Sequence, residues 1–181
     1  MKATGIVRRI DDLGRVVIPK ELRRTMHLRE GAPLEIFTDK DGELIFKKYS
    51  PIGELGEFAA DMCDSLRKAA ELPVAVCDRD SVIAVAGAAK KDLAGKAVSG
   101  ELEGLMERRA LYRRAAAAPA VPACEGTDKY AVAVAAPILC EGDVAGCVLF
   151  LSQEGEKGGC GETEEKLARA AAHFLGRQME G

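Results

Sequence analysis

The residues of this chain that could bind a charged ligand are cationic and gather near its start. Four of them follow a spacing of i, i+3, i+4 and i+7: Lys20, Arg23, Arg24 and His27. A helix with this spacing presents all four on one face and Leu22 and Met26 on the opposite face. Phosphate recognition needs this arrangement, and arginine favours bidentate contacts to phosphate or guanine. The alternative is a charged face that meets only water.

Three arginines before this helix favour the ligand-binding interpretation. Arg8 and Arg9 precede a turn and Arg15 follows it, and Gly14 lets that turn come close to a backbone. Residues 1–29 contain eight Lys and Arg against three Asp and Glu, whereas residues 51–181 contain 15 against 21. The net charge of −3 of the whole chain therefore hides a basic region at one end. Such a local excess of cations is typical of nucleic-acid binding.

The remaining titratable residues predict no catalytic residue, no metal site and no cofactor. The six cysteines form no Cys-x-x-Cys pair, and His27 and His173 lie near opposite ends of the chain, so zinc spacings are missing. We expect the cysteines to be buried apolar residues, with any further role open. The string Asp39-Lys40-Asp41-Gly42 hints at a calcium loop, but the later ligands are missing and a tight hairpin is the better interpretation.

The elements that must position the cations form a small β-rich domain over residues 1–50. The expected order is strand 4–10, strand 15–18, helix 20–26, strand 33–38 and strand 43–48. Asp11-Asp12-Leu13-Gly14 is expected to turn the chain between the first two strands, and Pro19 suits the start of the helix. Because these residues include too few large apolar side chains to bury a core alone, we expect them to fold with a partner chain.

The rest of the chain predicts a linker helix over residues 51–72 and a regulatory domain over residues 73–181. The expected strands are 73–77, 82–86, 131–138 and 144–151, and a final helix covers 162–179. Charged helical segments are expected within 92–109 and a flexible loop over 115–126. The strands are apolar on both alternating faces, so we expect helices or a lid on both sides of the sheet.

The segment Gly5 to Arg23 contains the string Asp-x-x-Gly-Arg-Val-x-Ile-Pro-x-x-Leu-Arg and resembles the AbrB-type swapped-hairpin DNA-binding domain. The resemblance continues through residues 31–37 and 47–52 into the linker helix. Residues 77–80 and 174–180 are similar to segments of regulators that carry a GAF domain behind such a module. The likeness is strong over the first 52 residues and patchier after them.

The resemblance implies two domains: an all-β-rich swapped-hairpin dimeric barrel with a short helix, then an α/β (α+β) GAF-like domain with an antiparallel sheet. By position, the DNA-contacting arginines of the family fall on Arg8, Arg15, Arg23 and Arg24. Arg9 and Lys20 are weaker candidates. The family also implies a transcription factor of the sporulation programme that activates some forespore promoters and represses others.

The expected partners are double-stranded DNA and further copies of the chain. We expect a homodimer through the N-terminal domain and a homotetramer through the apolar stripes of helices 51–70 and 162–179. The GAF-like domain either binds an unnamed small molecule or carries an empty pocket. Since the N-terminus shows no signal peptide and no membrane span, we expect a cytoplasmic, nucleoid-associated protein.

Two other functions stay open beside the expectation of no enzyme activity. Some GAF-like domains reduce methionine sulfoxide with cysteines, and Cys124, Cys140 and Cys147 lie in the second half of the chain. AbrB-type modules also occur in antitoxins, where a short acidic tail usually follows them. A longer chain with a second folded domain weakens that alternative.

Overall fold

The computed structural model describes residues 5–26, 28, 30–153 and 160–180, and its contacts divide the chain into two units. The N-terminal unit comprises residues 1–49 and the C-terminal unit residues 50–181. Each unit is described by itself below. No helix among the described residues is long and apolar enough to cross a membrane.

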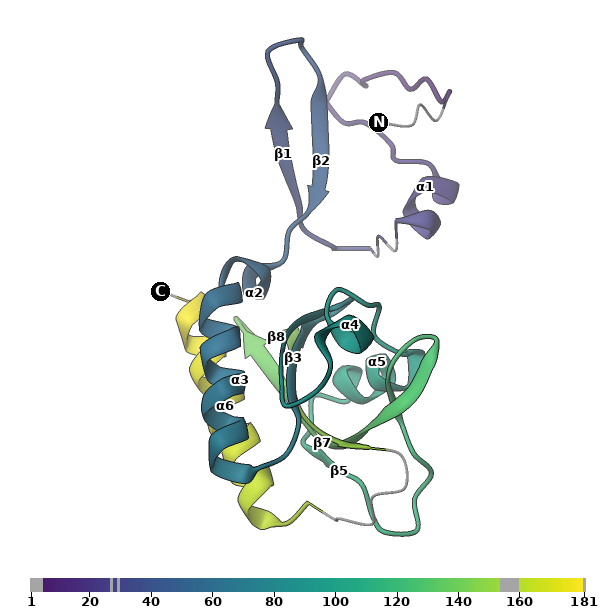
Figure 1. The fold of residues 1–181 in the computed structure, drawn as a ribbon. Coiled ribbons are helices and arrows are strands. Elements are labelled where there is room, and N and C mark those ends of the chain that lie inside the picture. The colour runs from purple at the N-terminus through teal and green to yellow at the C-terminus, as the bar shows by residue number, and fades with distance from the viewer. Residues whose placement is uncertain (1–4, 27, 29, 154–159, 181) are drawn as a thin grey trace. The chain divides into compact units, whose positions relative to one another are not determined.

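The N-terminal unit contains one short helix and one hairpin. Helix α1 covers Lys20–Thr25, and strands β1 (Leu34–Thr38) and β2 (Leu44–Lys48) pair antiparallel (Figure 1). The register places Leu34 opposite Lys48 and Thr38 opposite Leu44. This confirms the predicted second hairpin, because the Asp-Gly pair at its turn supplies the tight connection that the two strands need.

The first predicted hairpin is only partly present. Its turn at residues 11–15 forms, but the described residues of 5–10 and 15–18 belong to no strand, so the prediction of two strands there is wrong for the single chain. A strand exists only where a neighbour accepts and donates its ladder hydrogen bonds. Helix α1 also stops one residue earlier than predicted, with Met26 as its C-cap. His27, the fourth member of the predicted basic stripe, lies outside the described residues.

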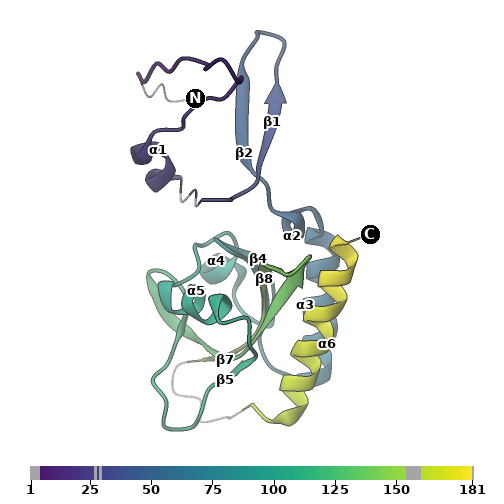
Figure 2. The ribbon, with the colours of Figure 1, turned by 180° about the vertical axis from the view of Figure 1, so that it is seen from behind.

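Two long helices lie side by side on one side of the C-terminal unit (Figures 1 and 2). The predicted linker helix is two helices, α2 (Pro51–Glu54) and α3 (Gly56–Ala70), with a break at Leu55. The Ser50 hydroxyl caps α2 by accepting a hydrogen bond from the Gly53 amide at 3.2 Å. The last helix, α6, covers Glu162–Met179, and acidic residues in its first turn favour its start.

The sheet of this unit is antiparallel and has six strands in the described residues. They are β3 (Val74–Asp78), β4 (Val82–Ala86), β5 (Tyr112–Arg113), β6 (Pro122–Cys124), β7 (Thr127–Cys140) and β8 (Asp143–Gln153). The order is β4-β3-β8-β7-β5, and β6 pairs with β7. The prediction of a loop over 115–126 was wrong near its end, because residues 122–124 form strand β6 and pair with β7.

Both faces of the sheet carry an apolar core, as the sequence predicted. On one face, Phe150 and Val148 pack with side chains of α2, α3 and α6. On the other, Leu149 and Leu151 pack with residues of α4 (Lys90–Leu93) and α5 (Gly100–Glu107). Leu149 and Phe150 are neighbours on β8 and point to opposite faces, so the strand is buried continuously from Gly146 to Ser152.

The backbone of β3 leaves no space for a side chain at Gly146 of β8. A Cβ added there would overlap the backbone carbonyl oxygen of Cys77 on β3. That carbonyl belongs to a buried strand and has no room to move. Position 146 therefore requires a residue without a side chain.

Candidate nucleic-acid interface

Helix α1 presents the basic face that the sequence predicted. Lys20, Arg23 and Arg24 are all exposed, and Leu22 on the opposite face is half-buried. Pro19 is the N-cap of the helix, and its carbonyl accepts a hydrogen bond from the Arg23 amide at 2.9 Å. Arg23 and Arg24 lie in its last turn, where the negative end of the helix dipole stabilises positive charge. The face is thus accessible to an anionic ligand.

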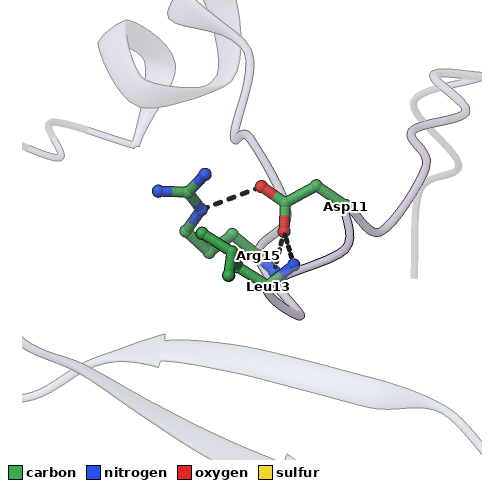
Figure 3. Close-up of polar contacts among 3 residues, drawn as sticks. All are labelled: Asp11, Leu13 and Arg15. Carbon is green, nitrogen blue, oxygen red and sulfur yellow. Dashed lines mark hydrogen bonds and ion pairs between the residues drawn. The ribbon is translucent and has the colours of Figure 1, made fainter.

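Arg15 is held by the turn that precedes α1 (Figure 3). Its Nε donates to Oδ2 of Asp11 at 2.8 Å, and its backbone amide donates to Oδ1 of the same carboxylate at 2.7 Å. Oδ1 also accepts a hydrogen bond from the Leu13 amide at 3.0 Å. Asp11 therefore orders the turn with one oxygen and the arginine side chain with the other.

The charge on Asp11 is stabilised by these contacts. The pKa of its carboxyl lies below the usual 3.8, first because the Arg15 backbone amide donates to it and then because the Arg15 side chain does. Asp11 is thus ionised at neutral pH. The side chain of Arg15 remains 69% exposed despite the ion pair, and the pair engages Nε and not the terminal nitrogens.

Arg8 and Arg9 complete the set of predicted site residues. Both are exposed on the segment before the turn, and no described residue forms an ion pair with either. The structure places three candidates on α1, one in the turn and two before it. Among the described residues, no hydrogen bond or ion pair joins these three groups to one another.

Asp11 is the contact partner of a candidate residue that sequence reasoning missed, because it was assigned to turn formation alone. The signal was available: Asp11 and Arg15 are opposite charges four residues apart. Such spacing usually suggests a pair on a helix, whereas here a turn brings the two side chains together.

The N-terminal unit has almost no core of its own. Among its described residues only Pro19 is buried. Its exposed large apolar side chains are Ile6, Val7, Ile10, Leu13, Val16, Val17, Met26, Ile36, Phe37, Leu44, Phe46 and Tyr49. An apolar surface of this extent is unusual for a monomer and is typical of units that bind another chain.

The cysteines of the C-terminal unit are poor nucleophiles. All six are free thiols, and Cys77 and Cys147, which lie opposite each other on β3 and β8, are fully buried. Burial raises the pKa of the Cys63 thiol to about 12 and that of Cys160 to about 11, and it raises the pKa of Cys124 and Cys140 as well. No group of three His, Cys, Asp or Glu within the described residues is placed to hold a metal ion.

Two family profiles match the chain, one in each unit. Residues 54–180 match the family described as Stage V sporulation protein T C-terminal, transcription factor. Residues 7–54 match the family described as Antidote-toxin recognition MazE, bacterial antitoxin. The first match covers most of the chain.

Individual proteins and structures agree with this division. The chain is 50% identical over 184 residues to Stage V sporulation protein T of Bacillus subtilis (strain 168), which covers 99% of each chain. It is 61% identical over 51 residues to the transition state regulatory protein AbrB of the same organism, covering 28% of this chain and 52% of AbrB. The GAF domain of a phosphoenolpyruvate-protein phosphotransferase from Coxiella burnetii covers 69% of this chain and 82% of its own, with a TM-score of 0.54 and 20% identity. The resemblance to AbrB-type and GAF-like domains is thereby confirmed.

Proposed function

The chain belongs to the stage V sporulation protein T family of transcription factors, and from this premise we propose that it regulates sporulation genes by binding double-stranded DNA. Its N-terminal unit, similar to that of AbrB, makes the contacts. The contacting residues are Arg8, Arg15, Arg23 and Arg24, with Arg9 and Lys20 in support. The protein acts at the nucleoid, as an activator at some forespore promoters and a repressor at others.

The observation that carries the proposal is the exposure of every one of these cations on a basic unit. Residues 1–50 contain 11 Lys and Arg against eight Asp and Glu, and the described acidic residues neutralise only Arg15 among the candidates. Unpaired arginines on a surface can each displace a counterion from DNA. A merely solvated surface would have no such effect on the salt dependence of binding.

The N-terminal unit acts as an interlaced homodimer. The residues before and after the first turn, which belong to no strand in the single chain, pair with the partner chain and complete the barrel. This exchange also covers apolar side chains that are exposed in the single chain, such as Val7 and Ile36. A dimer presents two copies of the basic set to one duplex.

The C-terminal unit holds two such dimers together as a tetramer. Exposed Phe58 on α3 and Phe174 on α6 lie on the helical layer and supply its apolar contacts. A tetramer raises the effective concentration of the second dimer at paired DNA sites. Light scattering on the full chain should give a tetramer, and on residues 1–50 a dimer. A dimer for both samples refutes this part of the proposal.

Two other functions receive less support. Methionine sulfoxide reduction needs a thiolate, but desolvation raises the pKa of Cys124, Cys140 and Cys147, so we propose that the chain is not an enzyme. The match of residues 7–54 to an antitoxin family favours toxin binding as a second candidate. A short tail that wraps a toxin would then be expected, whereas residues 50–181 form a unit with two apolar cores.

The salt dependence of binding tests the proposal. If each arm of the dimer neutralises about three phosphates, the logarithm of affinity falls against the logarithm of salt with a slope of about −5. Arg23→Ala in both arms removes two contacts, so the slope becomes shallower by about 2. The matched control is Arg177→Ala, an exposed arginine of α6 paired with Glu180. A slope near zero for the wild type refutes DNA binding through these residues.

A further inference from the structure

We propose that Arg15 reads a guanine base and that Asp11 is the residue that positions it. Arg23 and Arg24, with which no described residue forms an ion pair, then bind the phosphates. This assignment rests on the proposed function, because it divides the DNA contacts of the N-terminal unit between base and backbone. It starts from a comparison of two turns within the same unit.

The turns at residues 11–15 and 39–43 share one hydrogen-bond pattern. In each, the first aspartate accepts with Oδ1 from the amides two and four residues later: Leu13 and Arg15 at 3.0 and 2.7 Å, Asp41 and Glu43 at 2.8 and 3.3 Å. In each, the fourth residue is a glycine with a positive φ, 77° at Gly14 and 81° at Gly42. One carboxylate oxygen is therefore sufficient to build this turn.

The two turns differ in what the second carboxylate oxygen, Oδ2, contacts. Oδ2 of Asp11 accepts from Nε of Arg15 at 2.8 Å, whereas the equivalent position of the second turn is Glu43, whose side chain has no N–H group to donate. The contact between Asp11 and Arg15 is thus an addition that the turn itself does not require. Its effect is to fix a long side chain that would otherwise sample many rotamers.

The contact leaves the outer end of the guanidinium available. Because Asp11 engages Nε, the two terminal nitrogens of Arg15 point away as a fork, and the side chain is 69% exposed. A fork of two donors matches O6 and N7 of guanine in the major groove. Fixing the guanidinium before binding increases its discrimination between bases, because the side chain cannot rearrange to form hydrogen bonds with a different base.

The charge of the pair favours a base over a phosphate. Asp11 and Arg15 together carry no net charge, and the carboxylate repels a phosphate that approaches the arginine. A guanine edge is neutral and meets only the donors. By contrast, no described residue pairs with Arg23 or Arg24, so each carries a full positive charge and is the better phosphate ligand.

The test uses the full-length protein and duplexes that it selects from a random pool. Each guanine of the selected site is replaced in turn by 7-deazaguanine, which lacks the N7 acceptor. At one position per half-site the wild type should lose affinity about tenfold, within the range of a bidentate pair. Asp11→Asn keeps an Oδ1 acceptor for the turn but cannot accept from Nε, and it should lose this sensitivity. Asp39→Asn is the matched control and should behave as the wild type.

The sign of the Asp11→Asn effect separates positioning from simple charge. Loss of a repelling carboxylate alone would strengthen binding to every duplex and leave the 7-deazaguanine effect intact, and that result overturns the proposal. If Arg15→Ala weakens all duplexes equally and no guanine matters, Arg15 binds phosphate and the proposal is also wrong. A wild type that binds no duplex refutes the proposed function as well. Sensitivity lost in both Asp11→Asn and Arg15→Ala, with the double variant no worse than Arg15→Ala, supports the assignment.

Discussion

Replacing Val7 by alanine should weaken the N-terminal dimer far more than its position in the single chain suggests. Val7 is 87% exposed there, so in a monomer the change should cost less than about 0.5 kcal/mol. If the dimer buries Val7, each copy loses about 1.5 kcal/mol of apolar burial, or about 3 kcal/mol per dimer. That free energy corresponds to about a 150-fold weaker dimer.

Thermal unfolding of residues 1–50, followed by circular dichroism at several concentrations, measures this effect. For a dimer of about 100 residues, a tenfold dilution should lower the Tm by about 7 °C, because dissociation accompanies unfolding. Val7→Ala should lower it by about 15 °C at fixed concentration. Val17→Ala is the matched control: Val17 is 70% exposed and, in a paired strand, shares the face of Arg15. Equal effects of the two variants, or a Tm independent of concentration, would refute the interlaced dimer.

Two further predictions concern single sites of each unit. Gly146→Ala should destabilise the C-terminal unit by about 2–3 kcal/mol in urea unfolding, since the new Cβ meets the Cys77 carbonyl. Gly104→Ala on α5, where a Cβ meets open space, should instead stabilise it by about 0.5–1 kcal/mol, and similar losses in both would contradict the packing. In an NMR titration the Asp11 carboxyl should have a pKa below 3.8. The ionised carboxylate therefore contributes fully to the stability of the unit above pH 3.8, and this contribution is lost as the pH falls through the lowered pKa. Arg15→Ala should raise this pKa only part of the way, because the backbone amide still donates; an unchanged pKa would rule out the ion pair.

Local sequence signals predicted the elements whose hydrogen bonds close within one chain. The Asp-Gly turn at residues 41–42 fixes a two-strand ladder between β1 and β2, and the apolar runs of β3, β4, β7 and β8 fix a sheet covered on both faces. Helix spacing predicted α6 to within a residue of its observed bounds. In each case the pattern and the partner lie in the same chain.

The predictions that were wrong have physical explanations. The segments around the first turn have strand-forming residues, but no described strand of the chain pairs with them, so β-propensity alone formed no strand. The sequence did not predict the break at Leu55, because the helical spacing of apolar residues continues across it. Among the site residues, the basic spacing identified the cations, but the contact between Asp11 and Arg15 depends on the conformation of a turn, which side-chain spacing does not encode.

The division of charge explains how a chain with a net charge of −3 can bind a polyanion. Residues 1–50 carry +3 and residues 51–181 carry −6, counting Lys and Arg against Asp and Glu. At physiological ionic strength, charges more than about 8 Å from the DNA are largely screened, so the acidic unit opposes binding only where it approaches the duplex. Counterion release depends on the number of cations in contact with phosphate and not on the charge of the whole chain. A basic surface of this kind can therefore bind DNA even though the chain as a whole is negatively charged.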